Sequence, residues 1–342
     1  MVRMGQNVRV CGDNARPNFP RGLIGYSAGV VLGVVAGLAP WICHAAEFGT
    51  GPWLKGYSDI FAGIVPAAPG FYFRGDAYHY EASAGTLVFN GRVSLDVDQD
   101  MTASLFALTY VTPWKFLGGT YAIVAAPAVM ANDVNVGIGL PAFTGPRGRT
   151  FEPIEVNVGD TNLALGDTAF APLVLGWDAG NFHWNFSLFG LAPTGDYDVN
   201  QLANTSLNHW AIMPRLGATY FDPRTGWQLN GVFVYSWSFK NPETEYETGQ
   251  ILNLEGSVVK NFGPLGLGAV GYAMIQTTGD SGAGARLGSF ESRVYGIGPI
   301  LTFTTSADPN KSLTVLVKGY HEFDAEHTFE GNVVDVAASF KF

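Results

Sequence analysis

The chain ends in a segment where apolar and polar positions alternate. In Asn332–Phe342 the polar residues Asp335, Ser339 and Lys341 share one face. The opposite face carries Val334, Val336, Ala338, Phe340 and Phe342. Side chains alternate across a β-strand with period two, so this segment predicts a strand with one apolar and one polar face. A terminal aromatic residue on such a strand is typical of the closing strand of an outer-membrane β-barrel, where the apolar face meets lipid and the polar face meets a wet lumen.

The same alternation is clearest in Gly226–Lys240. Polar residues such as Gln228 and Asn230 dominate one face of this segment. The other face consists of Trp227, Leu229, Gly231, Phe233, Tyr235, Trp237 and Phe239. Aromatic residues at both ends of one apolar face match the two interfacial girdles of a membrane barrel, whereas a soluble sandwich strand rarely carries five aromatic residues on one face.

Turn sequences divide the remaining chain into strands. Short turns, such as Asp222–Gly226, alternate with longer polar links, such as 137–160. Short turns face the periplasm in such barrels, so the alternation predicts an all-β, antiparallel transmembrane barrel of twelve strands with both termini periplasmic. If Asp98–Asp100 is also a turn, the even total becomes fourteen. The predicted strands span residues 71–82, 87–112, 119–136, 161–177, 181–194, 209–222, 226–240, 248–262, 264–279, 289–306, 311–324 and 332–342.

The start of the chain has the pattern of a secretory signal peptide. Residues 1–22 carry four arginines against one acidic residue, and Leu23–Cys43 contains no charge. Small residues follow, so we predict a signal peptide over residues 1–45 that is cleaved after Ala45, with cleavage after Ala46 as the next choice. The apolar run is long enough to span a bilayer, so an uncleaved anchor is the alternative. The only two cysteines lie in this removed part, which excludes disulfides and thiolate sites from the mature chain.

Residues 46–70 have no clear strand pattern. The prolines and glycines around Ile60, Phe61, Ile64 and Val65 leave two alternatives, a periplasmic lead-in or a plug folded into the lumen. The barrel itself is predicted over residues 71–342.

Composition supports this class and narrows the partners. The net charge is −10, and it becomes more negative once the basic leader is removed, which argues against a nucleic-acid partner. The chain contains 44 glycines and 13% aromatic residues beside only 14% charged residues, an unusual balance for a soluble enzyme. Glycines at barrel bends and aromatic residues at two membrane interfaces explain both values.

Three stretches resemble the outer-membrane family named for the meta-pathway of phenol degradation. They are Gly56–Tyr80, Leu108–Tyr121 with its Thr-Pro-Trp-Lys core, and the Asp222–Gly226 turn with its aromatic strand. The resemblance covers essentially the mature chain. It implies a relationship to outer-membrane transporters of hydrophobic compounds, and hence uptake of apolar or aromatic molecules. It brings no catalytic residues.

Two motifs that could bind a cofactor or a metal have simpler structural interpretations. Gly266–Gly271 matches a dinucleotide-binding fingerprint, but no helical pattern follows it, so we interpret it as a curved strand and predict no cofactor. His321–His327 with Glu330 clusters imidazoles and carboxylates, yet the spacing fits no standard metal-ligand pattern and favours a solvated loop. No nucleophile is paired with a base, so we predict neither an enzyme nor a metal site.

Candidates for the solute path lie on the predicted lumen face. In strand 87–112 the face opposite Leu95, Met101, Ala103 and Leu105 holds Phe106, Leu108 and Tyr110, which we place inside as an apolar path. Interior packing, or a register shift across Asp98–Asp100, is the alternative. The polar candidates for the lumen are Asn185, Gln228, Asn230 and Glu255.

The sequence therefore predicts an outer-membrane channel for passive uptake of small hydrophobic or aromatic compounds. The alternative is a structural or adhesive barrel with a closed lumen that acts through outer loops such as 137–160. The expected partners are outer-membrane lipid and lipopolysaccharide, the barrel assembly machinery through Phe342, and small apolar solutes.

Overall fold

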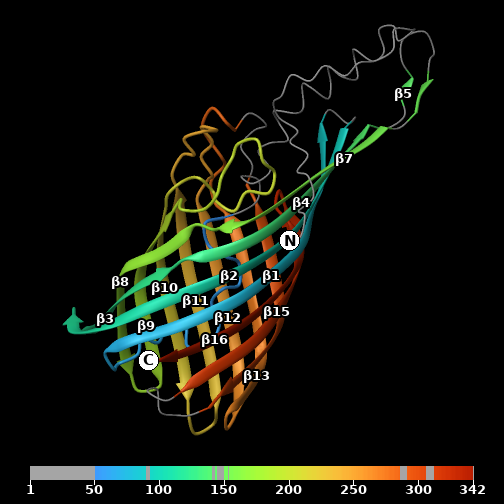
Figure 1. Ribbon diagram of the computed structural model, residues 1–342. Helices are drawn as coiled ribbons and strands as arrows, with labels where there is room; N and C mark the ends of the chain where they lie inside the picture. Colours follow the sequence, from blue (N-terminus) through green and yellow to red (C-terminus); the bar gives the residue numbers. More distant parts are fainter. Residues whose placement is uncertain are drawn as a thin grey trace, which may run out of the picture.

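A barrel of antiparallel β-strands forms the body of the protein (Figure 1). The computed structural model describes residues 51–89, 93–140, 143–144, 150–152, 154–285, 291–305 and 312–341. The strands are β1 (Gly70–Phe89), β2 (Val93–Phe116), β3 (Gly119–Ala126), β4 (Ala128–Leu140), β5 (Phe143–Thr144), β6 (Thr150–Phe151), β7 (Ile154–Leu165), β8 (Thr168–Ala179), β9 (Phe182–Ala192), β10 (Ala211–Asp222), β11 (Trp227–Ser238), β12 (Ile251–Phe262), β13 (Leu265–Gln276), β14 (Arg293–Thr304), β15 (Leu313–Glu326) and β16 (Glu330–Lys341). No helix in these residues is long and apolar enough to cross a membrane.

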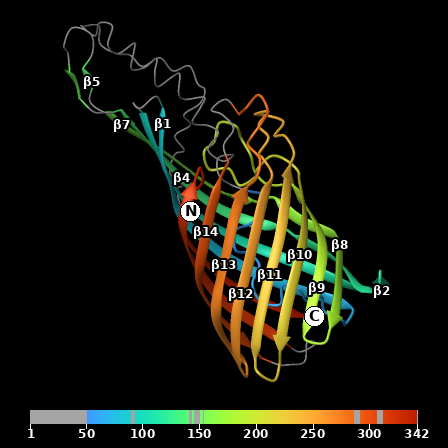
Figure 2. The same cartoon turned by 180° about the vertical axis from the view of Figure 1, so that it is seen from behind.

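Twelve strand positions surround the lumen, which confirms the predicted count. Fourteen strands of the described residues join in one sheet, but β3 and β4 lie end to end against β2. On the far side of this pair, β8 and β7 also lie end to end, so each pair occupies one position. Strands β9 to β16 follow in sequence order, and β1 closes the barrel by pairing with both β16 and β2 (Figure 2).

The interruption between β3 and β4 falls at Pro127. Proline has no backbone N–H to donate, so it breaks the ladder of hydrogen bonds at this point. The wall still holds together there, because Phe106 donates its backbone N–H to the Pro127 carbonyl at 3.0 Å and Gly166 donates to the Ala128 carbonyl at 2.9 Å. One long wall strand thus changes direction without leaving the sheet.

The outer surface carries an apolar band with aromatic residues at both ends. Phe233 and Leu254 are among the exposed apolar residues of the middle band. At the end with the short turns, which is periplasmic in barrels of this class, the exposed aromatic residues include Trp114, Phe116, Phe182, Trp184, Trp227 and Phe262. At the opposite end they include Trp210, Trp237, Phe239 and Phe323. This is the surface that a lipid bilayer requires.

The upper parts of β1, β2, β4 and β7 extend beyond the rest of the wall (Figure 1). Asp98–Asp100 lies within β2 at the base of this extension, where β1 still pairs with the first residues of β16, and it pairs without interruption with β1 and β4. The alternative of fourteen strands, which needed a turn at these residues, is therefore wrong. The carboxylates are accommodated in a strand because this part of the wall stands in water, where their exposed side chains stay hydrated.

The first hairpin is longer than predicted. The predicted first strand ended at residue 82 and the predicted second strand began at residue 87. In the structure β1 runs to Phe89 and β2 starts at Val93. The small residues that looked like a loop are paired instead, with a bulge between Ala84 and Leu87. Small side chains on a two-stranded extension give little alternation, so the pattern was uninformative here.

Candidate functional site

Residues 51–69, which precede β1, lie inside the barrel and contact several walls. Gly63 donates its backbone N–H to Thr219 Oγ1 of β10 at 2.9 Å, and Asn185 of β9 donates its side-chain amide to the Ala62 carbonyl at 2.8 Å. Trp53 donates to Glu255 of β12 at 3.0 Å. We call residues 51–69 the lumen segment.

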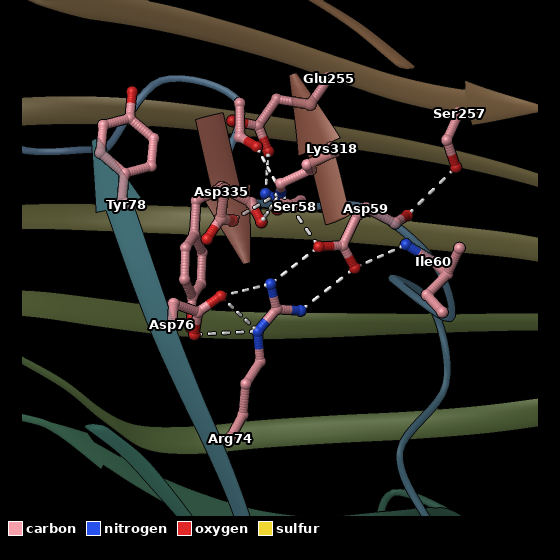
Figure 3. Close-up of polar contacts among 12 residues, drawn as sticks. Ser58, Asp59, Ile60, Arg74, Asp76, Tyr78, Glu255, Ser257, Lys318 and Asp335 are labelled. Carbon is pink, nitrogen blue, oxygen red and sulfur yellow. Dashed lines mark hydrogen bonds and ion pairs between the residues drawn. The ribbon is translucent and has the colours of Figure 1, made fainter. Parts of the chain in front are cut away.

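Buried ion pairs fix the middle of the lumen segment (Figure 3). Asp59 accepts two hydrogen bonds from the guanidinium of Arg74 on β1, at 2.7 and 3.1 Å. Arg74 also pairs with Asp76 at 2.6 Å. The ammonium of Lys318 on β15 lies 3.0 Å from Asp59 and 3.3 Å from Asp335 on β16. A charge-assisted, bidentate pair of this kind fixes both position and orientation.

Lys318 also holds the backbone of the lumen segment. Its ammonium donates to the carbonyls of Gly56 at 2.6 Å and Tyr57 at 2.8 Å, and its side chain is fully buried. A buried ammonium without partners is very costly, so Lys318 is stable only while the lumen segment and its carboxylates stay in place. The segment and the wall thus depend on each other.

A second group of buried polar contacts lies nearer the outer end. Lys55 of the lumen segment pairs with Glu322 of β15 at 2.6 Å. The same carboxylate accepts hydrogen bonds from the hydroxyls of Tyr80 at 2.7 Å and Tyr272 at 2.5 Å. Glu255 completes the attachment by accepting the Ser58 backbone N–H at 2.9 Å. The lumen segment is therefore fastened mainly to β1 and to the wall from β12 to β16.

Close backbone contacts set the path of the lumen segment across β8 to β10. A Cβ at Gly63 would lie 2.5 to 2.6 Å from backbone atoms of Thr219, Ala218 and His183, so only glycine fits against this wall. On β8, Gly176 leaves the space that Val65 occupies, because a Cβ there would lie 2.5 Å from the Val65 Cβ.

A cavity of about 1300 Å³ runs beside the lumen segment. At the outer end its lining includes Leu202 and Phe329, and at the periplasmic end it includes Gly263 and Lys341. Between them the wall from β2 to β4 and β8 to β10 contributes small or apolar side chains, among them Met101, Ala103, Leu105, Ala107, Ala122, Val124, Ala126, Ala128, Met130, Val134, Ala169 and Val174. The many alanines leave room that larger side chains would fill.

The prediction that Phe106, Leu108 and Tyr110 face the lumen is wrong for β2. Phe106 and Leu108 are exposed on the outer surface, and Tyr110 shares their face. Leu105, Ala107 and Thr109 line the cavity instead. The outer face of β2 also carries the exposed residues Asp96, Asp98 and Asp100, so acidic and apolar residues share one face of this strand. A strand that leaves the bilayer changes the polarity of its outer face without changing sides.

The four polar candidates do lie on the inner face of the wall. Asn185 lines the cavity. The side-chain amide of Asn230 donates to the Ser257 hydroxyl at 2.8 Å, and the side-chain amide of Gln228 lies 3.4 Å from Asn230 Oδ1. Glu255 is bonded to the lumen segment. A role of these side chains in a solute path stays a prediction.

The two chemical motifs have structural places. Gly266–Gly271 lies within β13, as the strand interpretation predicts. In the His321–His327 region, His321 contacts Asn332 and Glu326 pairs with Arg293 at 2.8 Å. Within the described ranges no group of three or more histidine, cysteine or acidic residues is arranged to hold a metal ion.

Sequence reasoning missed Asp59, Arg74, Lys318 and Asp335 as a unit. Arg74 and Asp76 occur two positions apart on the first strand. Lys318 and Asp335 are charged residues on the polar faces of the last two strands. A charge on the inner face of a barrel strand was the available signal. The partner of each charge depends on the barrel closing, which no local pattern encodes.

The closed sheet, the apolar outer band and the filled lumen define a β-barrel of the outer-membrane type. The chain belongs to the family described as "Putative MetA-pathway of phenol degradation", whose model matches residues 74–337. The predicted family is thereby confirmed. No curated protein matches the chain.

Two solved structures are similar to the chain. The crystal structure of an outer membrane channel from Pseudomonas putida F1 is 12% identical, with a TM-score of 0.56, over 82% of this chain and 100% of that chain. A Pseudomonas aeruginosa FadL homologue is 9% identical, with a TM-score of 0.40, over 86% of this chain and 98% of that chain. At 12% identity the first likeness establishes the fold.

Proposed function

We propose that the protein is an outer-membrane channel for the passive uptake of small hydrophobic or aromatic compounds. The observation that carries this proposal is the cavity, whose wall from β2 to β4 and β8 to β10 is rich in alanine, valine, leucine and methionine and which is bordered by residues from both ends of the barrel. An apolar solute loses no hydrogen bonds on entering such a space, whereas a sugar must leave its water without replacement. The name of the P. putida relative, an outer membrane channel, supports the same proposal.

The cavity argues for selective passage rather than general diffusion. The lumen segment lies inside the barrel and restricts the free space to the cavity beside it. A general porin keeps a wide polar lumen, which this barrel lacks.

A closed structural barrel is the second candidate function. It is favoured by the lumen segment itself, which the buried pairs of Asp59, Arg74 and Lys318 hold in place. In that case the protein acts through its outer loops and passes no solute.

Uptake into proteoliposomes distinguishes the two. We expect the barrel to speed entry of radiolabelled phenol or an alkylbenzene well above the leakage of empty liposomes, and to leave glucose entry unchanged. Equal acceleration of glucose identifies a general porin. No acceleration of either solute identifies the closed barrel.

The export route and the partners belong to the same proposal. Residues 1–45 act as a signal peptide, and the mature chain begins near Ala46 and is inserted into the outer membrane by the barrel assembly machinery through its terminal Phe342. These residues lie outside the described ranges. N-terminal sequencing of the purified membrane protein tests this, because a retained Leu23–Cys43 contradicts it. Lipid and lipopolysaccharide contact the apolar outer band.

A further inference from the structure

An arginine on the cavity wall has neutral hydrogen-bond acceptors where the paired cations nearby have carboxylates. In the described part of the lumen, Lys55 pairs with Glu322, Arg74 with Asp59 and Asp76, and Lys318 with Asp59 and Asp335. Arg215 of β10 also lines the cavity. Among the described residues no carboxylate lies within ion-pair distance of its guanidinium.

Neutral groups hold the Arg215 guanidinium in one orientation. Its Nη1 donates to Asn185 Oδ1 at 2.9 Å, and its Nη2 donates to the Ala62 carbonyl at 3.1 Å. Gly217 leaves the space for this arrangement, because a Cβ there would lie 2.9 Å from Nη1 and 2.3 Å from the Ala62 oxygen. These contacts satisfy two of five N–H groups, and both acceptors are neutral.

We infer that Arg215 recognises the carboxylate of a small amphipathic anion that enters the cavity. This inference rests on the proposed channel function. It adds aromatic and short aliphatic carboxylates to the proposed substrates. A guanidinium presents a planar fork of donors that matches a carboxylate, and the low dielectric of an apolar cavity strengthens the attraction.

The surroundings of Arg215 favour an anion with an apolar body. Phe189 and Met213 line the cavity beside it, and Ser187 adds a hydroxyl. Ser187 and Arg215 are direct partners across β9 and β10. A cation without an ion-paired carboxylate, next to Phe189 and Met213, suits a single negative charge on a ring or short chain.

Arg215 also touches the lumen segment through Ala62, so a purely structural role must be separated from recognition. Benzoate and benzamide provide the comparison, because they have nearly the same shape and differ in charge at pH 7. We propose to measure the binding of each to the purified full-length protein in non-ionic detergent micelles by isothermal titration calorimetry. The variants are Arg215→Met, Arg215→Lys and the control Arg293→Met, which removes an exposed arginine at the outer end. Heat-modifiable migration on a gel checks that each variant is folded.

The wild type is expected to bind benzoate more tightly than benzamide. Loss of a charge-assisted hydrogen bond in Arg215→Met should weaken benzoate by roughly tenfold or more and reduce the preference to near unity. Arg215→Lys should retain most of the preference, and Arg293→Met should retain all of it.

Three results overturn the inference. The first is a wild type that binds benzoate no more tightly than benzamide. The second is an Arg215→Met variant that loses affinity for both ligands equally. The third is an equal loss of benzoate affinity in Arg215→Met and Arg215→Lys. Each leaves the channel proposal intact if proteoliposomes still take up toluene faster than glucose. Failure of the toluene experiment refutes the channel proposal itself.

Discussion

The two halves of the lumen wall differ in what they do with their inward side chains. The wall from β12 to β16, together with β1, carries carboxylates and cations that bind the lumen segment, including Glu255, Lys318 and Glu322. The wall from β2 to β4 and β8 to β10 carries mainly alanine, valine and methionine and borders the cavity. We call the first the filled half, because it holds the ion pairs to the lumen segment, and the second the open half, because it forms the alanine-rich wall of the cavity.

The difference shows how a barrel of this width restricts its lumen. Ion pairs in a low dielectric fix the lumen segment firmly to one side, because removing either partner leaves a buried charge. On the other side Asn185, Arg215 and Thr219 hydrogen-bond to the segment, and the small apolar side chains elsewhere on that wall leave space. The position of the lumen segment, which the ion pairs of the filled half fix, thus defines the solute path.

The largest expected effect follows from removing Lys318. In Lys318→Met the carboxylates of Asp59 and Asp335 lose a buried cation, and two carbonyls of the lumen segment lose their donor. Breaking a buried pair in this way costs about 3–5 kcal/mol. We expect a lower temperature for the loss of the folded band on gels, and a larger conductance in planar bilayers as the lumen segment detaches.

Lys240→Met is the matched control for Lys318. Lys240 is half exposed and lies 3.8 Å from Glu245, and exposed pairs contribute about 0–1 kcal/mol. The double variant Lys318→Met with Asp335→Asn should recover part of the lost stability, because it removes one uncompensated charge. Unchanged melting and conductance in Lys318→Met would show that the filled half does not depend on its ion pairs.

The next effect tests which face of β2 belongs to the open half. Phe106→Asp places a carboxylate on the lipid face, which costs up to about 2 kcal/mol near the middle of the membrane, whereas Thr109→Asp places one against the cavity. The yield of heat-modifiable folded protein should fall more in Phe106→Asp. The reverse order would mean that the faces of β2 are exchanged.

A bulky side chain in the open half should reduce flux without loosening the lumen segment. Ala103 lines the cavity, so Ala103→Trp is expected to lower alkylbenzene uptake severalfold in proteoliposomes at an unchanged melting temperature. Ala77→Trp adds the same indole to the exposed outer face of β1 and serves as the control. Equal uptake by both variants would show that the solute does not pass through the cavity.

The smallest expected effect concerns the outer loop at the mouth of the open half. Burial lowers the pKa of His209 from its ordinary value of 6.5, and the hydrogen bond with the Trp210 carbonyl and the charge of Asp167 only partly offset this. The loop should therefore be most stable above about pH 6.5 and lose stability as the pH falls towards the lowered pKa, because only the unfolded form accepts the proton readily. Hydrogen exchange of residues 196–208 should rise on acidification, and His209→Gln should flatten this dependence. A rise that persists in His209→Gln would assign it to other groups.

Local pattern was sufficient for the barrel and for most of its strands. Alternation in Gly226–Lys240 and at the chain end identified the lipid face, since the bilayer imposes an apolar side on every spanning strand. It failed in β2, where the strand continues into water and acidic residues share a face with Phe106. The polar inner positions of Asn185, Gln228, Asn230 and Glu255 also followed from alternation alone.

What the sequence by itself determined is the class of protein: an antiparallel membrane barrel of twelve strands, because strand periodicity and turn chemistry act over a few residues. Only the tertiary structure decided how the lumen is occupied. Asp59 meets Arg74 and Lys318 across 15 and 259 positions of sequence, and Arg215 remains without a carboxylate because of where the lumen segment lies. Such pairings arise when the sheet closes around the segment, and they depend on distances between strands that local sequence does not specify.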